Sequence, residues 1–136
     1  MKQSWQNKQY TEGPVPPDWS AASFGISTAD SWLEVKGIAR LPFGIDQRSI
    51  DQAGNRGWFV THLPSGLAVV TQVRALAVAL AFVDRIAGLT DWDAQTISAT
   101  LGLRERVRQA LDHAYGDFHA DKLPDLLQDT WPVIRS

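Results

Sequence analysis

The chain has 136 residues, of which 44% are hydrophobic and 21% charged, and its net charge is −2. This length is typical of one globular domain, and the composition excludes a disordered or fibrous chain. The absence of cysteine excludes disulfides, thiolate metal sites and a cysteine nucleophile, and it is consistent with a reducing cytoplasm. No signal-peptide pattern opens the chain, and the apolar run 75–83 is too short to span a membrane. We therefore expect a cytoplasmic protein.

Residues 1–22 are dense in proline, which forbids a regular helix and favours extended or turn structure. The sequence therefore predicts a proline-rich N-terminal arm, followed by a single domain over residues 23–136. Trp5 and Trp19 lie in this arm without a periodic pattern, so we expect both to be exposed. Because tryptophan is enriched at interfaces, both are candidate partner-binding residues.

The strand signals come next along the chain. Residues 31–39 alternate, with Trp32, Glu34 and Lys36 on one side, which predicts a half-buried strand. Residues 40–56 are polar and broken by proline and glycine, so we expect a long connection there. Residues 58–62 and 67–71 are strand-like, and the Pro-Ser-Gly between them predicts the turn of a β-hairpin.

Helical patterns fill the rest of the chain. Residues 72–87 are apolar nearly all round, which predicts a buried helix. A second helix is expected from Thr90, and Gly102 separates it from a third helix, which ends at Gly116. A short last helix is expected over residues 123–127. This order predicts an α+β fold, in which a small antiparallel sheet of the hairpin plus one strand packs against three to four helices.

Residues 58–66 read WFVTHLPSG. They resemble the W-x-V-T-H-x-P-[ST]-G hairpin of short accessory proteins carried by phages, plasmids and integrated elements; the resemblance covers these residues alone. Some accessory proteins of this kind block host defence complexes, as anti-CRISPR inhibitors do. The resemblance therefore implies stoichiometric binding to a host complex and no catalysis.

The C-terminal third is acidic, because residues 112–129 hold five aspartates against one lysine. Such a segment can be an ordinary solvated face, or an anionic surface that docks on the basic groove of a nucleic-acid-binding partner. On the second interpretation, Asp117, Asp121 and Asp125 join the candidate partner-binding residues.

Residues 91–112 support a competing hypothesis, a helix-turn-helix DNA-binding regulator with Gly102 in its turn. Arg104, Arg106 and Arg108 would then be the nucleic-acid-binding residues, although Arg108 falls where the motif expects a buried side chain. A helical hairpin with a solvated basic face is the plainer alternative.

Enzymatic and metal-binding hypotheses have weaker support. His62 lies near Thr61 and Ser65, but no G-x-S-x-G elbow surrounds any serine. A second group of possible ligands consists of His113, Asp117, His119 and Asp121, which lack the helical histidine pair of a zinc site. We therefore expect no catalytic residue, metal or cofactor. The sequence favours a protein-interaction module, then a DNA binder, then an enzyme.

Overall fold

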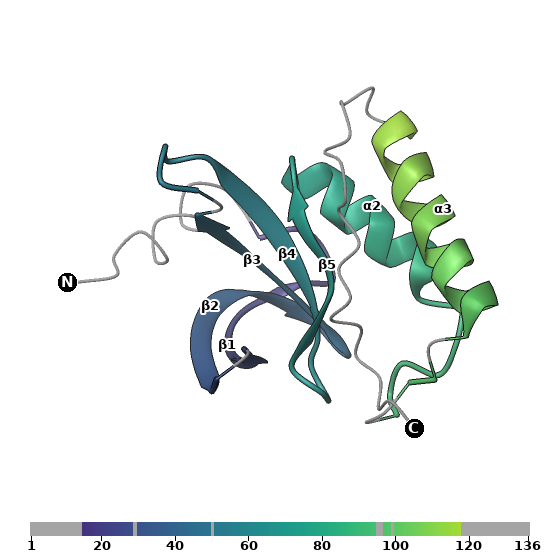
Figure 1. Ribbon diagram of the computed structural model, residues 1–136, viewed down its shortest axis with the longest axis horizontal. Helices are drawn as coiled ribbons and strands as arrows, with labels where there is room; N and C mark the ends of the chain where they lie inside the picture. The colour runs from purple at the N-terminus through teal and green to yellow at the C-terminus, as the bar shows by residue number, and fades with distance from the viewer. Residues whose placement is uncertain (1–14, 29, 50, 95–96, 99, 118–136) are drawn as a thin grey trace.

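The computed structural model describes residues 15–28, 30–49, 51–94, 97–98 and 100–117. These residues form one five-stranded antiparallel sheet with the strand order β1-β2-β3-β4-β5, and two helices (Figure 1). The elements are β1 (Ser20–Ser27), β2 (Trp32–Arg40), β3 (Phe43–Ser49), β4 (Arg56–His62), β5 (Leu67–Val73), α2 (Leu76–Ile86) and α3 (Leu101–Asp117). The α+β class is as expected. The expected sheet of three strands with three to four helices is wrong, because the described residues form five strands and two helices.

Two strands were not expected from the sequence. β1 begins only three residues after Pro17 and consists mostly of serine, alanine and glycine. β3 lies inside the segment expected to be a long connection, and it alternates Phe43 and Ile45 with Gly44 and Asp46. All four of these residues are buried, so β3 is covered on both faces. Glycine and aspartate are uncommon in strands, which is why this segment was expected to be a loop.

The helices also differ from the expectation. The described residues between 90 and 100 form no helix, so a helix starting at Thr90 is wrong. Gly102 lies inside α3 and does not separate two helices, whereas the described part of α3 runs to Asp117, one residue past the expected end at Gly116. The apolar helix is confirmed as α2, but it starts at Leu76 because β5 continues to Val73. The short helix expected at 123–127 lies outside the described residues.

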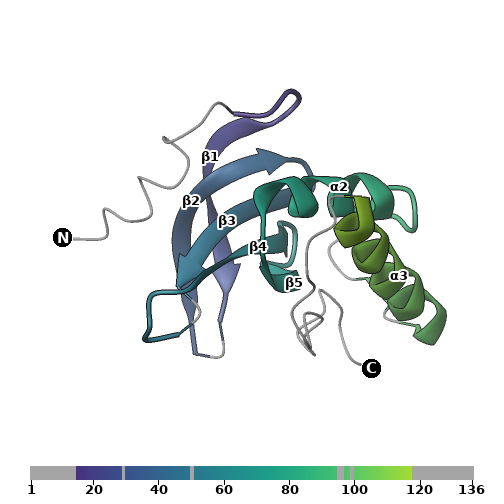
Figure 2. The same cartoon turned by 90° about the horizontal axis from the view of Figure 1, so that it is seen from above.

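The main core lies between one face of the sheet and the two helices. In Figure 2, α2 lies next to the sheet and α3 packs beyond it. Side chains of β2 to β5 meet Val78, Phe82 and Ile86 of α2, all three fully buried, and α3 adds Val107 and Leu111. Burial on this scale is the main source of stability in a domain of this size.

The opposite face of the sheet is covered by its first strand, β1. Phe24 and Ile26 of β1 form a second, smaller cluster with Val35 of β2 and Leu63. Gly44 in β3 makes this packing possible, because a Cβ there would lie 2.8 Å from the Phe24 ring. The sheet is therefore curved strongly enough for β1 to lie over β3. Neither helix in the described part of the chain is long and apolar enough to cross a membrane.

Candidate interaction surface

The structure does not gather the residues that the sequence proposed for partner binding. Trp19 is only 8% exposed, and the Arg40 guanidinium lies 5.3 Å from the centre of its ring, so the expected exposure is wrong. It is buried because it directly precedes β1 and is drawn into the main core. Asp117, at the end of α3, forms an ion pair with Arg85 at 2.9 Å. Trp5, Asp121 and Asp125 lie outside the described residues.

The described residues do not form a helix-turn-helix. Residues 91–94 and 97–98, where the first helix was expected, are not helical, and the expected turn residue Gly102 lies in the first turn of α3. Arg106 and Arg108 are exposed on α3, whereas Arg104 is partly buried. Arg108 thus lies in solvent where the motif expects a buried side chain. The three arginines belong to one continuous helix, and only Arg106 and Arg108 lie on its outer surface.

His62 is a fully buried structural group in β4. Its Nε2 lies 2.6 Å from the carbonyl oxygen of Trp92, and its Nδ1 lies 2.9 Å from Ser65 Oγ. A carbonyl only accepts, so Nε2 donates to Trp92; in the neutral imidazole Nδ1 then carries no proton and accepts from the Ser65 hydroxyl. Burial lowers the pKa of His62 below its ordinary value, which favours this neutral form. The imidazole therefore fastens β4 to the segment that follows α2.

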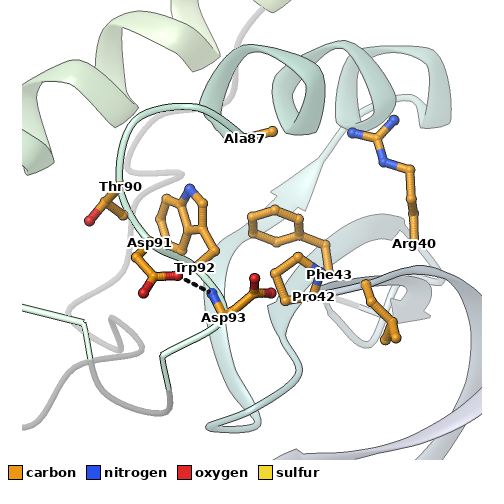
Figure 3. Close-up of a pocket in the computed structure, with 9 residues that line it drawn as sticks. Arg40, Pro42, Phe43, Ala87, Thr90, Asp91, Trp92 and Asp93 are labelled. Carbon is orange, nitrogen blue, oxygen red and sulfur yellow. Dashed lines mark hydrogen bonds between the residues drawn. The ribbon is translucent and has the colours of Figure 1, made fainter.

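A hollow of about 280 Å³ lies beside this segment (Figure 3). Its floor contains Phe43 and Trp92, whose rings meet edge to face at 5.3 Å. Asp91 accepts a hydrogen bond from the backbone N–H of Asp93 at 3.1 Å, and Arg40 is held by Asp84. The hollow thus combines an apolar floor with the carboxylates of Asp91 and Asp93.

The most exposed aromatic side chain in the described residues is that of Trp32, at the start of β2. Trp32 is 61% exposed and its neighbour Leu33 is 53% exposed. One side of the Trp32 ring rests on two glycines: a Cβ at Gly66 would lie 2.5 Å from it, and a Cβ at Gly25 would lie 3.1 Å from it. The ring is thus held in place by backbone while much of it stays in solvent.

The strand beside Trp32 has an edge that is open over its first residues, whereas its last residue, Ser27, lies against the β4–β5 turn. β1 pairs with β2 along one side. On its other side, among the described residues, it makes one backbone hydrogen bond, from Ser27 N to Gly66 O at 2.7 Å. Its sequence, SAASFGIS, contains no charge and no proline, the residues that normally protect an edge strand from pairing. We call Trp32 and the open edge of β1 the β1–β2 surface.

The sequence contained a usable signal for Trp32. Alternation places it on the same side of β2 as Glu34 and Lys36, and all three are exposed. A tryptophan in phase with charged residues is expected to face solvent. The open edge of β1 had no comparable signal, because strand pairing between distant segments is not encoded locally.

The candidate metal ligands are only partly covered by the structure. His113 and Asp117 lie on α3, whereas His119 and Asp121 fall outside the described residues. Within the described residues, no group of three or more histidine, aspartate or glutamate side chains could hold a metal ion.

No protein-family model, curated protein or solved structure matches this chain.

Proposed function

We propose that this protein is a non-enzymatic interaction module that binds a protein partner stoichiometrically through its β1–β2 surface. The observation that carries this proposal is the Trp32 side chain, exposed yet supported on two glycines, beside an uncharged strand edge. Tryptophan is one of the residue types enriched at binding hot spots, and a ring that is already held in place loses little entropy on binding. An open edge adds main-chain hydrogen bonds to such an anchor.

The partner we propose is a host complex of the kind that mobile elements inhibit, as anti-CRISPR proteins do. Support comes from the hairpin at residues 58–66, whose sequence resembles that of mobile-element accessory proteins. The acidic segment 112–129 supports a partner with a basic, nucleic-acid-binding groove. These two features are properties of the sequence and are independent of the β1–β2 surface.

The test is affinity capture from a nuclease-treated bacterial lysate with three forms of the protein. Wild type and Leu101→Ala should retain one partner in a fixed ratio, and Trp32→Ala should lose it. Leu101 is the matched control because it is a 78% exposed apolar residue on α3, a different element from the β1–β2 surface. Equal capture by Trp32→Ala and wild type would disprove a role for this surface.

Direct DNA binding is the second candidate, and one observation favours it. A hollow of about 350 Å³ between α2 and α3 is lined by Arg85, Arg106 and His113, so two arginines border it without a helix-turn-helix, and Arg85 is also paired with Asp117. If duplex DNA binds here, affinity should fall steeply with salt and should drop on Arg106→Ala. Arg108→Ala should bind as wild type does, because Arg108 does not line the hollow. No binding at low salt would exclude this candidate.

A further inference from the structure

The geometry of β1 points to a second copy of this chain as an occupant of its open edge. Two β1 strands would pair antiparallel about a two-fold axis at Ser23, joining two five-stranded sheets into one continuous sheet. The inference uses the surface of the proposed function, but it requires no foreign partner. A protein that adds a strand to β1 must compete with this second copy.

The backbone of β1 presents the correct groups for this pairing. Thr28 N donates to Ser31 O at 2.7 Å within the β1–β2 hairpin, whereas Ser27 N donates to Gly66 O on the opposite side. Backbone groups alternate along a strand, so the N–H and C=O groups of Ala21, Ser23 and Gly25 point away from β2, as those of Ser27 do. With the axis at Ser23, Ala21 faces Gly25 of the partner subunit, and each such pair can exchange two hydrogen bonds.

The side chains of β1 are compatible with their own two-fold copies. A two-fold axis at Ser23 places Ser23 opposite its own symmetry mate, so a charge on the axis would meet a like charge. β1 has none, and the side chains at Ala21, Ser23 and Gly25 are too small to clash. Phe24 is already packed inward against Leu63 and Gly44. The Trp32 ring, which rests beside Gly25, would gain Ala21 of the partner subunit as a neighbour.

The other edge of the sheet lacks these properties. The pairing of β5 with β4 is interrupted by register shifts at Trp58/Val60 and Val60/Thr61. Gln72, near the end of β5, has a φ of 61°, which is outside the strand region. Such irregularities disrupt the regular row of backbone groups that a new strand needs. Self-pairing through β1 therefore closes into a dimer and does not propagate into a fibre.

Sedimentation equilibrium of the pure protein over a wide concentration range tests this inference. Wild type should show a monomer–dimer equilibrium, and Ser23→Lys should weaken dimerisation at least tenfold, because it places two ammonium groups together at the axis. Ser98→Lys is the matched control, since Ser98 is exposed and lies outside the sheet, and it should dimerise as wild type does. A monomeric wild type, or a Ser23→Lys variant that dimerises normally, would overturn the inference.

A second measurement uses the absence of cysteine in the chain. A short bis-maleimide should link Ser23→Cys into dimers, because directly opposed Cβ atoms in an antiparallel pair lie about 5 Å apart. The same reagent should leave Ser98→Cys monomeric, and equal linking of both variants would contradict the pairing. Neither experiment contains a foreign partner, so failure here is distinct from failure of Trp32→Ala in the capture assay.

Discussion

The two faces of the sheet are covered in different ways. One face lies under α2 and α3 and contributes to a large apolar core, in which His62 is a fully buried polar side chain. The other face is covered by the bending of β1 over β3, and its apolar cluster contains Phe24, Ile26, Val35 and Leu63. The same face also contains the Asp46–Arg48 ion pair.

The position of the β1–β2 surface, away from the main core, separates binding from stability. Stability comes mainly from the helix-covered face, because apolar burial is extensive there. Beyond the part of the sheet that the helices cover, Trp32 and the edge of β1 lie in solvent. Changes on the helix-covered face should therefore unfold the protein, whereas changes at the β1–β2 surface should alter binding and leave the fold intact.

The largest expected effect is that of Phe82→Ala in α2. Phe82 is fully buried in the main core, so the free energy of unfolding should fall by about 3–5 kcal/mol. Phe24→Ala removes the same side chain from the smaller cluster, whose edge can relax, and should cost no more than about 3 kcal/mol. Urea unfolding of both variants measures the two losses in the free energy of unfolding. Equal losses would show that the two faces of the sheet contribute equally to the stability of the fold.

The Asp46–Arg48 pair should have the next largest effect. The Asp46 carboxylate is fully buried and accepts hydrogen bonds of 2.7 and 2.9 Å from Arg48, whose guanidinium lies 4.0 Å from the centre of the Phe59 ring. Burial raises the pKa of Asp46 although Arg48 opposes the shift. Asp46→Ala should cost about 3 kcal/mol, because it leaves Arg48 without its partner at a site 22% exposed.

The double variant Asp46→Ala with Arg48→Met should be more stable than Asp46→Ala alone. Replacing both charges removes the desolvation cost of the ion pair, and the methionine can keep the contact with Phe59. Urea unfolding of wild type, the two single variants and the double variant gives the four free energies of a double-mutant cycle. Strictly additive losses would show that the two side chains act independently.

The parts of the fold that could be predicted are those whose signals are local. The hairpin of β4 and β5 was predicted because Pro64 and Gly66 mark its turn, and α2 was predicted because its apolar residues recur at helical spacing. β3 was missed because Gly44 and Asp46 are unusual in a buried strand. Their presence is explained by Phe24, which packs on Gly44 from a distant segment, and by Arg48, which neutralises Asp46.

The β1–β2 surface was partly predictable, because one of its two features has a local signal in the sequence. The phase of Trp32 with Glu34 and Lys36 marks it as exposed, and this signal is contained within β2. Proline density alone suggested that Trp19 is exposed, which is wrong because β1 begins at the next residue. The edge of β1 could not be predicted, because it depends on which strands pair across the whole chain.

The smallest expected effect concerns pH and His62. Burial lowers the pKa of His62 from its ordinary value of 6.5, so below that pH the unfolded chain takes up a proton that the folded protein does not. The contribution of His62 to stability is therefore complete above about pH 6.5 and is lost as the pH falls towards the lower, folded pKa. Within that window the free energy of unfolding should fall by up to about 1.4 kcal/mol per pH unit.

Urea unfolding of wild type, His62→Gln and His113→Gln at about pH 7.5 and about pH 5.5 tests this origin of the pH dependence. His62→Gln should be less stable than wild type at the higher pH, because the glutamine cannot reproduce both hydrogen bonds to Trp92 and Ser65. Its stability should also change less between the two pH values. His113 is exposed on α3, so His113→Gln should keep the wild-type pH dependence. If His62→Gln retains that dependence, the acid sensitivity arises outside the helix-covered core, and the separation between the two faces is incomplete.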